Sequence, residues 1–117
     1  MMHDQPSKQD QIVRRQPLEH EIVTLFCELG PRGWKMPTLE LRAKEEPGLS
    51  EVELTARAFD MQGTGEVAGA PEDLMRVAVS YHALCSSFDQ GWNKALLTLT
   101  LGEKDKVTNV QWSFTYP

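Results

Sequence analysis

The sequence predicts a two-layer α+β domain, in which an antiparallel sheet of four strands carries two helices on one face. Two observations support this fold class. Segments with helical periodicity and segments that alternate apolar and polar residues follow one another in the order α-β-β-α-β-β. Each alternating segment has one apolar and one polar side, which is typical of a sheet covered on one face only.

The length of the chain fits one domain. At 117 residues and 13.2 kDa, it has the size of a single hydrophobic core. Residues 1–15 contain Ile12 and Val13 as their only sizeable aliphatic side chains, so we expect a flexible N-terminal arm there. Residues 16–117 should form the single α+β domain.

The first helix is expected from residue 16, with Pro17 at its first helical position and Gly30 as its C-terminal stop. A period of two follows in residues 34–44 and again in residues 50–59, and the turn "EEPG" between them makes the pair a hairpin. Residues 60–70, "DMQGTGEVAGA", carry three glycines within seven residues and are predicted as a loop.

The clearest helix is predicted at residues 71–88, "PEDLMRVAVSYHALCSSF". A closing hairpin follows in residues 91–117. Its inward side chains should form the floor on which both helices pack, and they are Ala95, Leu97, Leu99, Leu101, Val110, Trp112, Phe114 and Tyr116. Val107 is out of phase with the last four of these, which indicates a β-bulge near Thr108.

The charge of the chain bears on its partners. The net charge is −5, with a balance of +1 over residues 1–16 and therefore −6 over the remainder. Nucleic-acid binding requires clustered Lys and Arg, so we expect no nucleic-acid partner. An acidic body suits a basic protein partner better, although a solvated surface is the commoner meaning of such charge. We found no apolar run of signal-peptide or membrane-spanning length, and this favours a cytoplasmic protein without a membrane partner.

No catalytic, cofactor or metal site is predicted. The histidines His3, His20 and His82 are scattered, and none has a cysteine, aspartate or histidine at a metal-ligand spacing. We therefore expect structural or surface histidines and neither an enzyme nor a small-molecule substrate. Cys27 and Cys85 both lie in helical patterns and are expected to be reduced, partly buried thiols.

The candidate partner-binding residues lie on the polar side of the first hairpin and in the glycine-bearing loop. They are Glu40, Arg42, Glu51, Glu53, Arg57, Asp60 and Glu66. A mixed charged row of this kind is usually a solvated face, and as a functional feature it would be half of an electrostatically complementary interface. Trp34 and Trp92 are each either a core edge or an exposed anchor, and the core edge is favoured.

The C-terminal part of the chain carries a family resemblance. The second helix ends in "LCSSF", and "GW", the strand "NKALLTLTL", a charged turn and an aromatic strand closing near Tyr116 follow. Over residues 84–117 these features resemble the YezG-type family of bacterial immunity proteins, which neutralise polymorphic toxins. The resemblance implies an inhibitor that binds a cognate toxin domain and blocks it sterically and electrostatically, without catalysis. The acidic body of the chain is compatible with a basic nuclease as that toxin.

Two other functions remain open. An acidic secretion chaperone is also small and α+β, but such proteins usually dimerise through a further helix after the last strand, so a stable homodimer would favour this alternative. A small α+β enzyme would require a polar residue in an apolar pocket. A pocket that gathers His20 or His82 with a carboxylate would favour it.

Overall fold

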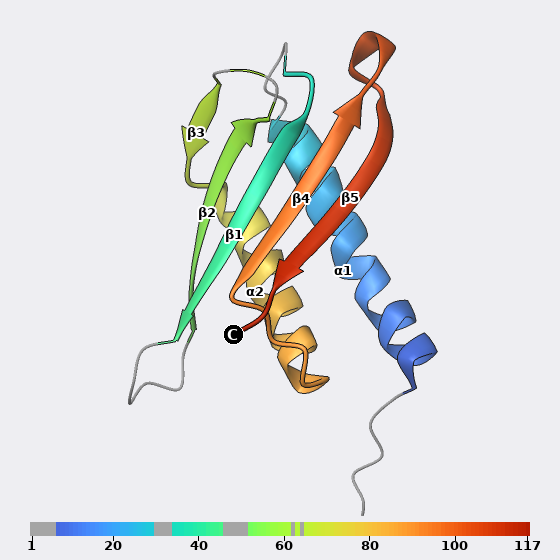
Figure 1. Cartoon of the computed structure of the whole chain (residues 1–117), viewed down its shortest axis with the longest axis vertical. Coiled ribbons are helices and arrows are strands. Elements are labelled where there is room, and N and C mark those ends of the chain that lie inside the picture. Colours follow the sequence, from blue (N-terminus) through green and yellow to red (C-terminus); the bar gives the residue numbers. More distant parts are fainter. Residues whose placement is uncertain (1–6, 30–33, 46–51, 62, 64) are drawn as a thin grey trace, which may run out of the picture.

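The computed structural model describes residues 7–29, 34–45, 52–61, 63 and 65–117. Their elements are α1 (Lys8–Leu29), β1 (Pro37–Glu45), β2 (Val52–Asp60), β3 (Glu66–Ala68), α2 (Glu72–Ser87), β4 (Lys94–Leu101), a short 3₁₀ turn (Glu103–Asp105) and β5 (Val107–Thr115). The predicted α+β class and the order of the six long elements are confirmed (Figure 1).

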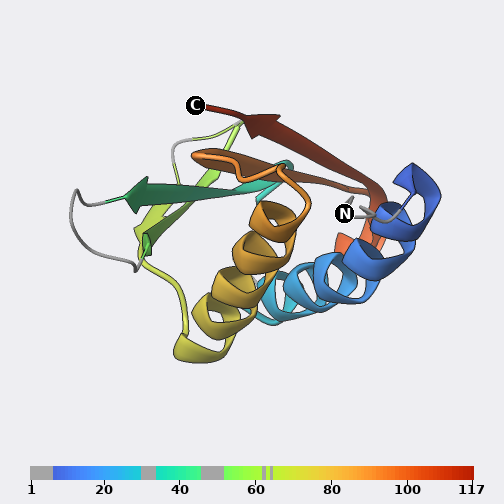
Figure 2. The same cartoon turned by 90° about the horizontal axis from the view of Figure 1, so that it is seen from below.

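The strands form one antiparallel sheet in the order β3-β2-β1-β4-β5. The central strand β1 therefore lies between its hairpin partner β2 and the first strand of the second hairpin. Both helices cover the same face of the sheet, as predicted (Figure 2). We call the other side, onto which Figure 1 looks, the open face, because no helix of the described chain covers it.

The register of the first hairpin places side chains on the predicted faces. Leu41 lies opposite Ala56 on the helix-covered face, and Glu40 lies opposite Arg57 on the open face. Each inner residue of β1 adds an apolar side chain to the core, and Leu39 and Leu41 are fully buried. The polar half of the alternation is thereby directed to the open face along both strands.

The predicted bulge in the closing hairpin is confirmed. Thr100 pairs with Asn109, and the next residue, Leu101, pairs with Val107, so Thr108 has no partner in β4. This extra residue explains why Val107 falls out of phase with the rest of its strand.

The closing hairpin supplies less of the core than predicted. Ala95, Leu97 and Leu99 of β4 are buried. In β5, however, Trp112 and Phe114 are only half-buried, while Val110 and Tyr116 are 43% and 50% exposed. The cause is the position of β5 at the edge of the sheet, where neighbours cover each side chain from one flank only.

The start of α1 also differs from the prediction. The helix begins at Lys8, so residues 8–15 are helical where the sequence suggested a flexible arm, and residues 1–6 lie outside the described part. Ser7 Oγ accepts a hydrogen bond from the backbone N–H of Asp10 at 3.2 Å, which is an N-terminal cap. Pro17 consequently lies inside the helix and not at its first position.

Part of the predicted loop 60–70 is a strand. Glu66–Ala68 pair with Arg57–Phe59 and extend the sheet by the short edge strand β3. Gly65, just before it, packs against the indole of half-buried Trp34, where an added Cβ would lie only 2.3 Å from Nε1. Gly69, just after it, has φ +84°, a conformation that favours glycine and ends the strand.

Candidate functional site

Four of the predicted partner-binding residues form a continuous charged row across three strands of the open face. The row consists of Glu40 and Arg42 on β1, Arg57 on β2 and Glu66 on β3. Strand alternation directs all four to the same side, and the β1–β2 register places Glu40 directly opposite Arg57. Residues that are distant in the sequence are in this way brought within contact distance.

The row alternates in sign. Glu40 Oε1 accepts a hydrogen bond from Arg42 Nε at 2.8 Å, and its Oε2 lies 3.7 Å from Arg57 Nη2. Arg57 Nη1 then donates to Glu66 Oε1 at 3.3 Å. The guanidinium carbon of Arg57 also lies 4.8 Å from the ring centroid of Phe59, a cation–π distance. Each charge is therefore held by a neighbour of opposite sign.

Burial differs strongly along the row. The Glu40 side chain is 11% exposed, whereas those of Arg42 and Arg57 are 63% and 47% exposed. Glu40 lies on the central strand, flanked by Arg57 on β2 and Leu96 on β4. The buried carboxylate thus orients two solvent-facing guanidinium groups, whose remaining donors are available to an external ligand.

Two shallow depressions flank this row. The smaller, of 270 Å³, is lined by Glu40, Arg42, Thr55, Ala56 and Arg57. The larger, of 650 Å³, shares Arg42 and Thr55 with it and is lined further by Ala43, Lys44, Glu53, Asn93, Lys94 and Thr115. The described open face is therefore mixed in charge, and its larger depression is rich in cations, although the chain as a whole is acidic.

The other three predicted residues do not join the row. Glu53 is exposed on β2 opposite Lys44. Asp60 is 8% exposed and accepts hydrogen bonds from the backbone N–H groups of Lys35 and Met36, at 3.2 and 3.0 Å. Asp60 therefore holds the segment that leads into β1. Glu51 lies outside the described residues.

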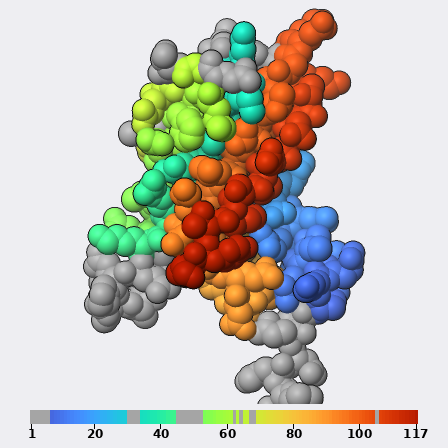
Figure 3. All heavy atoms as spheres, viewed as in Figure 1, coloured from blue at the N-terminus to red at the C-terminus, as the bar shows by residue number. Residues whose placement is uncertain are grey.

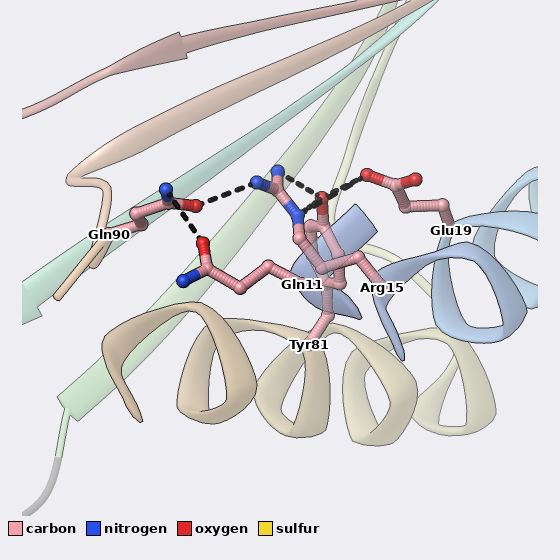
Figure 4. A network of polar contacts seen from close by, with 5 residues as sticks. All are labelled: Gln11, Arg15, Glu19, Tyr81 and Gln90. Atoms are coloured by element: carbon pink, nitrogen blue, oxygen red, sulfur yellow. Dashed lines mark hydrogen bonds and ion pairs between the residues drawn. The ribbon is translucent and has the colours of Figure 1, made fainter. Parts of the chain in front are cut away.

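A second polar network, which the sequence did not reveal, lies on the helix side of the sheet (Figure 4). Arg15 of α1 donates to the Tyr81 hydroxyl from Nε and Nη2 at 3.2 and 2.8 Å, and to Gln90 Oε1 from Nη1 at 3.0 Å. Gln90 in turn donates to Gln11 Oε1 at 3.2 Å. The spacing of Gln11, Arg15, Leu18 and Ile22 could have indicated that the helical face continues before Pro17.

Burial defines the chemistry of this second network. Tyr81 is fully buried, and its hydroxyl also donates to Glu19 Oε2. Desolvation, reinforced by the hydrogen bond to Glu19, raises the pKa of Tyr81 far above its ordinary range. A neutral, fully hydrogen-bonded phenol joining two helices has a structural role, and we do not count it as part of the binding surface.

The histidines do not meet a carboxylate in any described pocket. His82 is 7% exposed, its Nε2 lies 3.0 Å from the carbonyl oxygen of Trp92, and its ring packs edge-on against that indole. The 180 Å³ pocket beside it is lined by Ala43, His82, Gly91, Trp92, Asn93 and Pro117, without an acidic side chain. His20 is exposed on α1, and His3 lies outside the described residues.

Other predicted features have simple positions. Trp92 is 1% exposed and belongs to the core. Cys85 is buried, but Cys27 is exposed and not partly buried as expected.

Within the described ranges, no group of three or more His, Cys, Asp or Glu residues could hold a metal ion. Neither described helix combines the length and the apolar character that a membrane span requires.

Comparison with known proteins adds no assignment: no family model matches the chain, and no curated protein matches it.

Proposed function

We propose that this chain is a cytoplasmic immunity or inhibitor protein, which binds a cognate toxin domain and blocks it by steric and electrostatic complementarity. The observation that carries the proposal is the charged row, in which nearly buried Glu40 orients exposed Arg42 and Arg57 on a sheet face that neither described helix covers. The resemblance over residues 84–117 to YezG-type immunity proteins supports the same function.

The arrangement suits protein recognition for a physical reason. Binding costs less when the side chains that make contact are already held in place. The ion pairs with Glu40 restrict both arginines before a partner arrives, and arginine is enriched at the centre of protein interfaces. The alternating signs of the row require an opposite alternation on the partner, which provides specificity.

The mixed charge of the open face refines what the partner should look like. A uniformly basic surface would meet Arg42, Lys44 and Lys94 around the larger depression. We therefore expect the contacting surface of the toxin to place acidic groups there and basic groups against Glu53 and Glu66, even if the toxin as a whole is a basic nuclease. Inhibition then follows from occupying the toxin surface, without any reaction by this chain.

Co-expression with the product of the adjacent upstream gene tests this function. We expect that product to arrest growth when expressed alone, and we expect this chain to restore growth and to co-purify with it. Absence of both rescue and co-purification would refute the proposal.

A matched pair of variants tests the surface. Arg42→Ala should weaken the complex at least about tenfold in Kd. Arg76→Ala is the control, because Arg76 is similarly exposed at 70% and paired with Glu72 and Asp73, but lies on α2. Equal affinities of the two variants would exclude the charged row as the contact surface.

A further inference from the structure

The edge strand β5 lacks the usual protection of a sheet edge. From Val107 to Pro117 the sequence contains no Asp, Glu, Lys or Arg. Edge strands commonly avoid pairing with other chains by carrying charge or proline, by bulging or by being short. The opposite edge strand, β3, has only three residues, whereas β5 has nine, and its single bulge at Thr108 leaves the register from Asn109 to Thr115 regular. Among the residues that the structure describes, no strand pairs with this edge of β5, so a further strand can be added there.

The inner side of β5 is also incompletely covered. Val110 and Tyr116 are 43% and 50% exposed, and the stacked rings of Trp112 and Phe114 are half-buried. These four side chains point toward the helix layer, where a longer sheet would bury them. Apolar area of this kind stabilises any strand that covers it.

The helix layer continues past the sheet at the same place. The middle of α1 contacts β5, since the guanidinium carbon of Arg15 lies 5.0 Å from the ring centroid of Phe114. From there α1 runs obliquely, and its N-terminal half projects beyond the β5 edge, beside the C-terminal half of that strand (Figures 1 and 3). Ile12 and Val13 in this projecting part are 51% and 53% exposed. A strand added to β5 would lie over this part of α1.

We propose that the occupant is a second copy of this chain, whose β5 pairs antiparallel with β5 of the first and joins the two sheets into one. A twofold axis through the strand pair makes the arrangement self-complementary. Each projecting α1 half then lies behind the N-terminal half of the other copy's β5, where Val110 is exposed. Because the strand is uncharged, self-pairing opposes no like charges.

The proposed contact leaves the charged row free. That row lies on β1, β2 and β3, on the far side of the sheet from the β5 edge. Self-association and binding of a toxin domain can therefore occur at the same time. An experiment that refutes one of the two proposals leaves the other standing. The contact also joins strand edges, which differs from the helix-mediated dimer expected of a secretion chaperone.

Sedimentation equilibrium on the purified full chain tests the proposal. We expect a dimer of twice the 13.2 kDa chain mass within the micromolar range. Val110→Lys should weaken the dimer at least about tenfold, because it places a charge in the covered inner row. Val79→Lys is the control, since Val79 is similarly exposed at 49% but lies on α2, and its dimer constant should stay unchanged. A monomer at all concentrations, or equal effects of both variants, would overturn the proposal.

Disulfide trapping provides a second measurement that does not depend on how Val110→Lys folds. In a Cys27→Ser background, Asn109, Val110, Gln111, Trp112 and Ser113 are changed to Cys one at a time, and Glu66→Cys on β3 serves as the control. At least one β5 position should form an intermolecular disulfide under mild oxidation about tenfold faster than the control, because a twofold axis near the middle of the strand places one of these residues opposite its own copy. Equal rates at all positions would contradict self-pairing. So would β5 amides that become protected from exchange only when a different protein is added, because the edge would then accept a heterologous strand.

Discussion

The hydroxyl of Tyr81 on α2 donates a hydrogen bond to Oε2 of Glu19 on α1 at 2.5 Å, and both residues contact Arg15. The buried Tyr81 hydroxyl thus accepts hydrogen bonds from two N–H groups of Arg15 and donates one to the Glu19 carboxylate, and these bonds join the two helices. The Arg15 guanidinium continues the contact to the sheet by lying over the ring of Phe114. The network therefore fixes the position of α1 on both α2 and β5.

Removing this hydroxyl should destabilise the domain. Tyr81→Phe keeps the buried ring and the Arg15–Glu19 ion pair, but it removes the hydrogen bond that Glu19 Oε2 accepts and the acceptor of two Arg15 N–H groups. We expect a loss of about 1–3 kcal/mol in the free energy of unfolding, measured by urea denaturation. Tyr116→Phe, at a 50% exposed position, is the control and should change stability little. Equal stability of both variants would show that the Tyr81 hydroxyl contributes nothing to stability.

The same residue predicts a dependence on alkaline pH. Burial, and next the hydrogen bond to Glu19, raises the pKa of Tyr81 above its ordinary value of about 10. Above that pH the unfolded state releases the phenolic proton while the folded state retains it. The stabilisation is therefore complete below pH of about 10 and decreases as pH rises further, by up to about 1.4 kcal/mol per pH unit.

The comparison that isolates this effect uses Tyr81→Phe, because other groups titrate in the same range. The difference in unfolding free energy between the wild type and this variant should shrink as pH rises from about 9 to about 11. A difference that stays constant over this range would mean that Tyr81 ionises equally in both states.

The strand patterns predicted the sheet well because alternation reports burial directly. The faces of β1 and β2 and the bulge at Thr108 all followed from periods of two in the sequence. The pattern could not report that β5 lies at an edge, since strand order depends on contacts between distant segments. For that reason, the sequence predicted the same burial for Val110 and Tyr116 as for Leu97 and Leu99, although only the two leucines are buried.

The first helix was predicted too short for a related reason. Pro17 resembles a helix start, and residues 8–15 are too polar to indicate an apolar face. Their inward positions are instead occupied by Gln11 and Arg15, which are satisfied by Gln90 and Tyr81. Gln11 and Arg15 continue the helical spacing of Leu18 and Ile22, but polar side chains at such positions do not form the apolar pattern that indicates a buried helical face. The charged row was easier to predict from the sequence, because three of its four residues lie in one predicted hairpin.

Two tryptophans of the core should differ in their contribution. Trp92 is 1% exposed, so Trp92→Ala should cost about 3–5 kcal/mol of unfolding free energy. The half-buried Trp112 lies on the edge strand, and Trp112→Ala should cost clearly less. Thermal unfolding of the two variants under the same conditions shows which substitution destabilises the protein more. If Trp112→Ala proves the more damaging change at a concentration at which the chain is monomeric, the edge position of β5 in the monomer is wrong.

The two thiols should differ in reactivity. Cys27 is exposed on α1, and Cys85 is buried within the core, where burial raises the pKa of its thiol. With an aromatic disulfide reagent at neutral pH, we expect one thiol to react rapidly and the other only as fast as the protein opens. The rapid phase should disappear in Cys27→Ser. Two rapid phases in the native protein would contradict the burial of Cys85.

Glu40 should stabilise the open face electrostatically. Glu40→Gln keeps the shape of the side chain but removes the charge that holds Arg42 and Arg57. The two arginines then repel each other across the row, and because both are well exposed to solvent we expect a loss of only about 1 kcal/mol at low salt. At about 1 M salt the loss should shrink, since exposed charges are screened within about 3 Å.

The control for Glu40 is Glu72→Gln on α2. Glu72 also pairs with an arginine, Arg76, but at 3.9 Å and with 91% of its side chain exposed, so its removal should leave stability unchanged. Urea denaturation at both salt concentrations separates the two variants. If Glu40→Gln is as neutral as Glu72→Gln, the carboxylate does not restrain the arginines. The charged row would then offer a partner no advantage over any other solvated face.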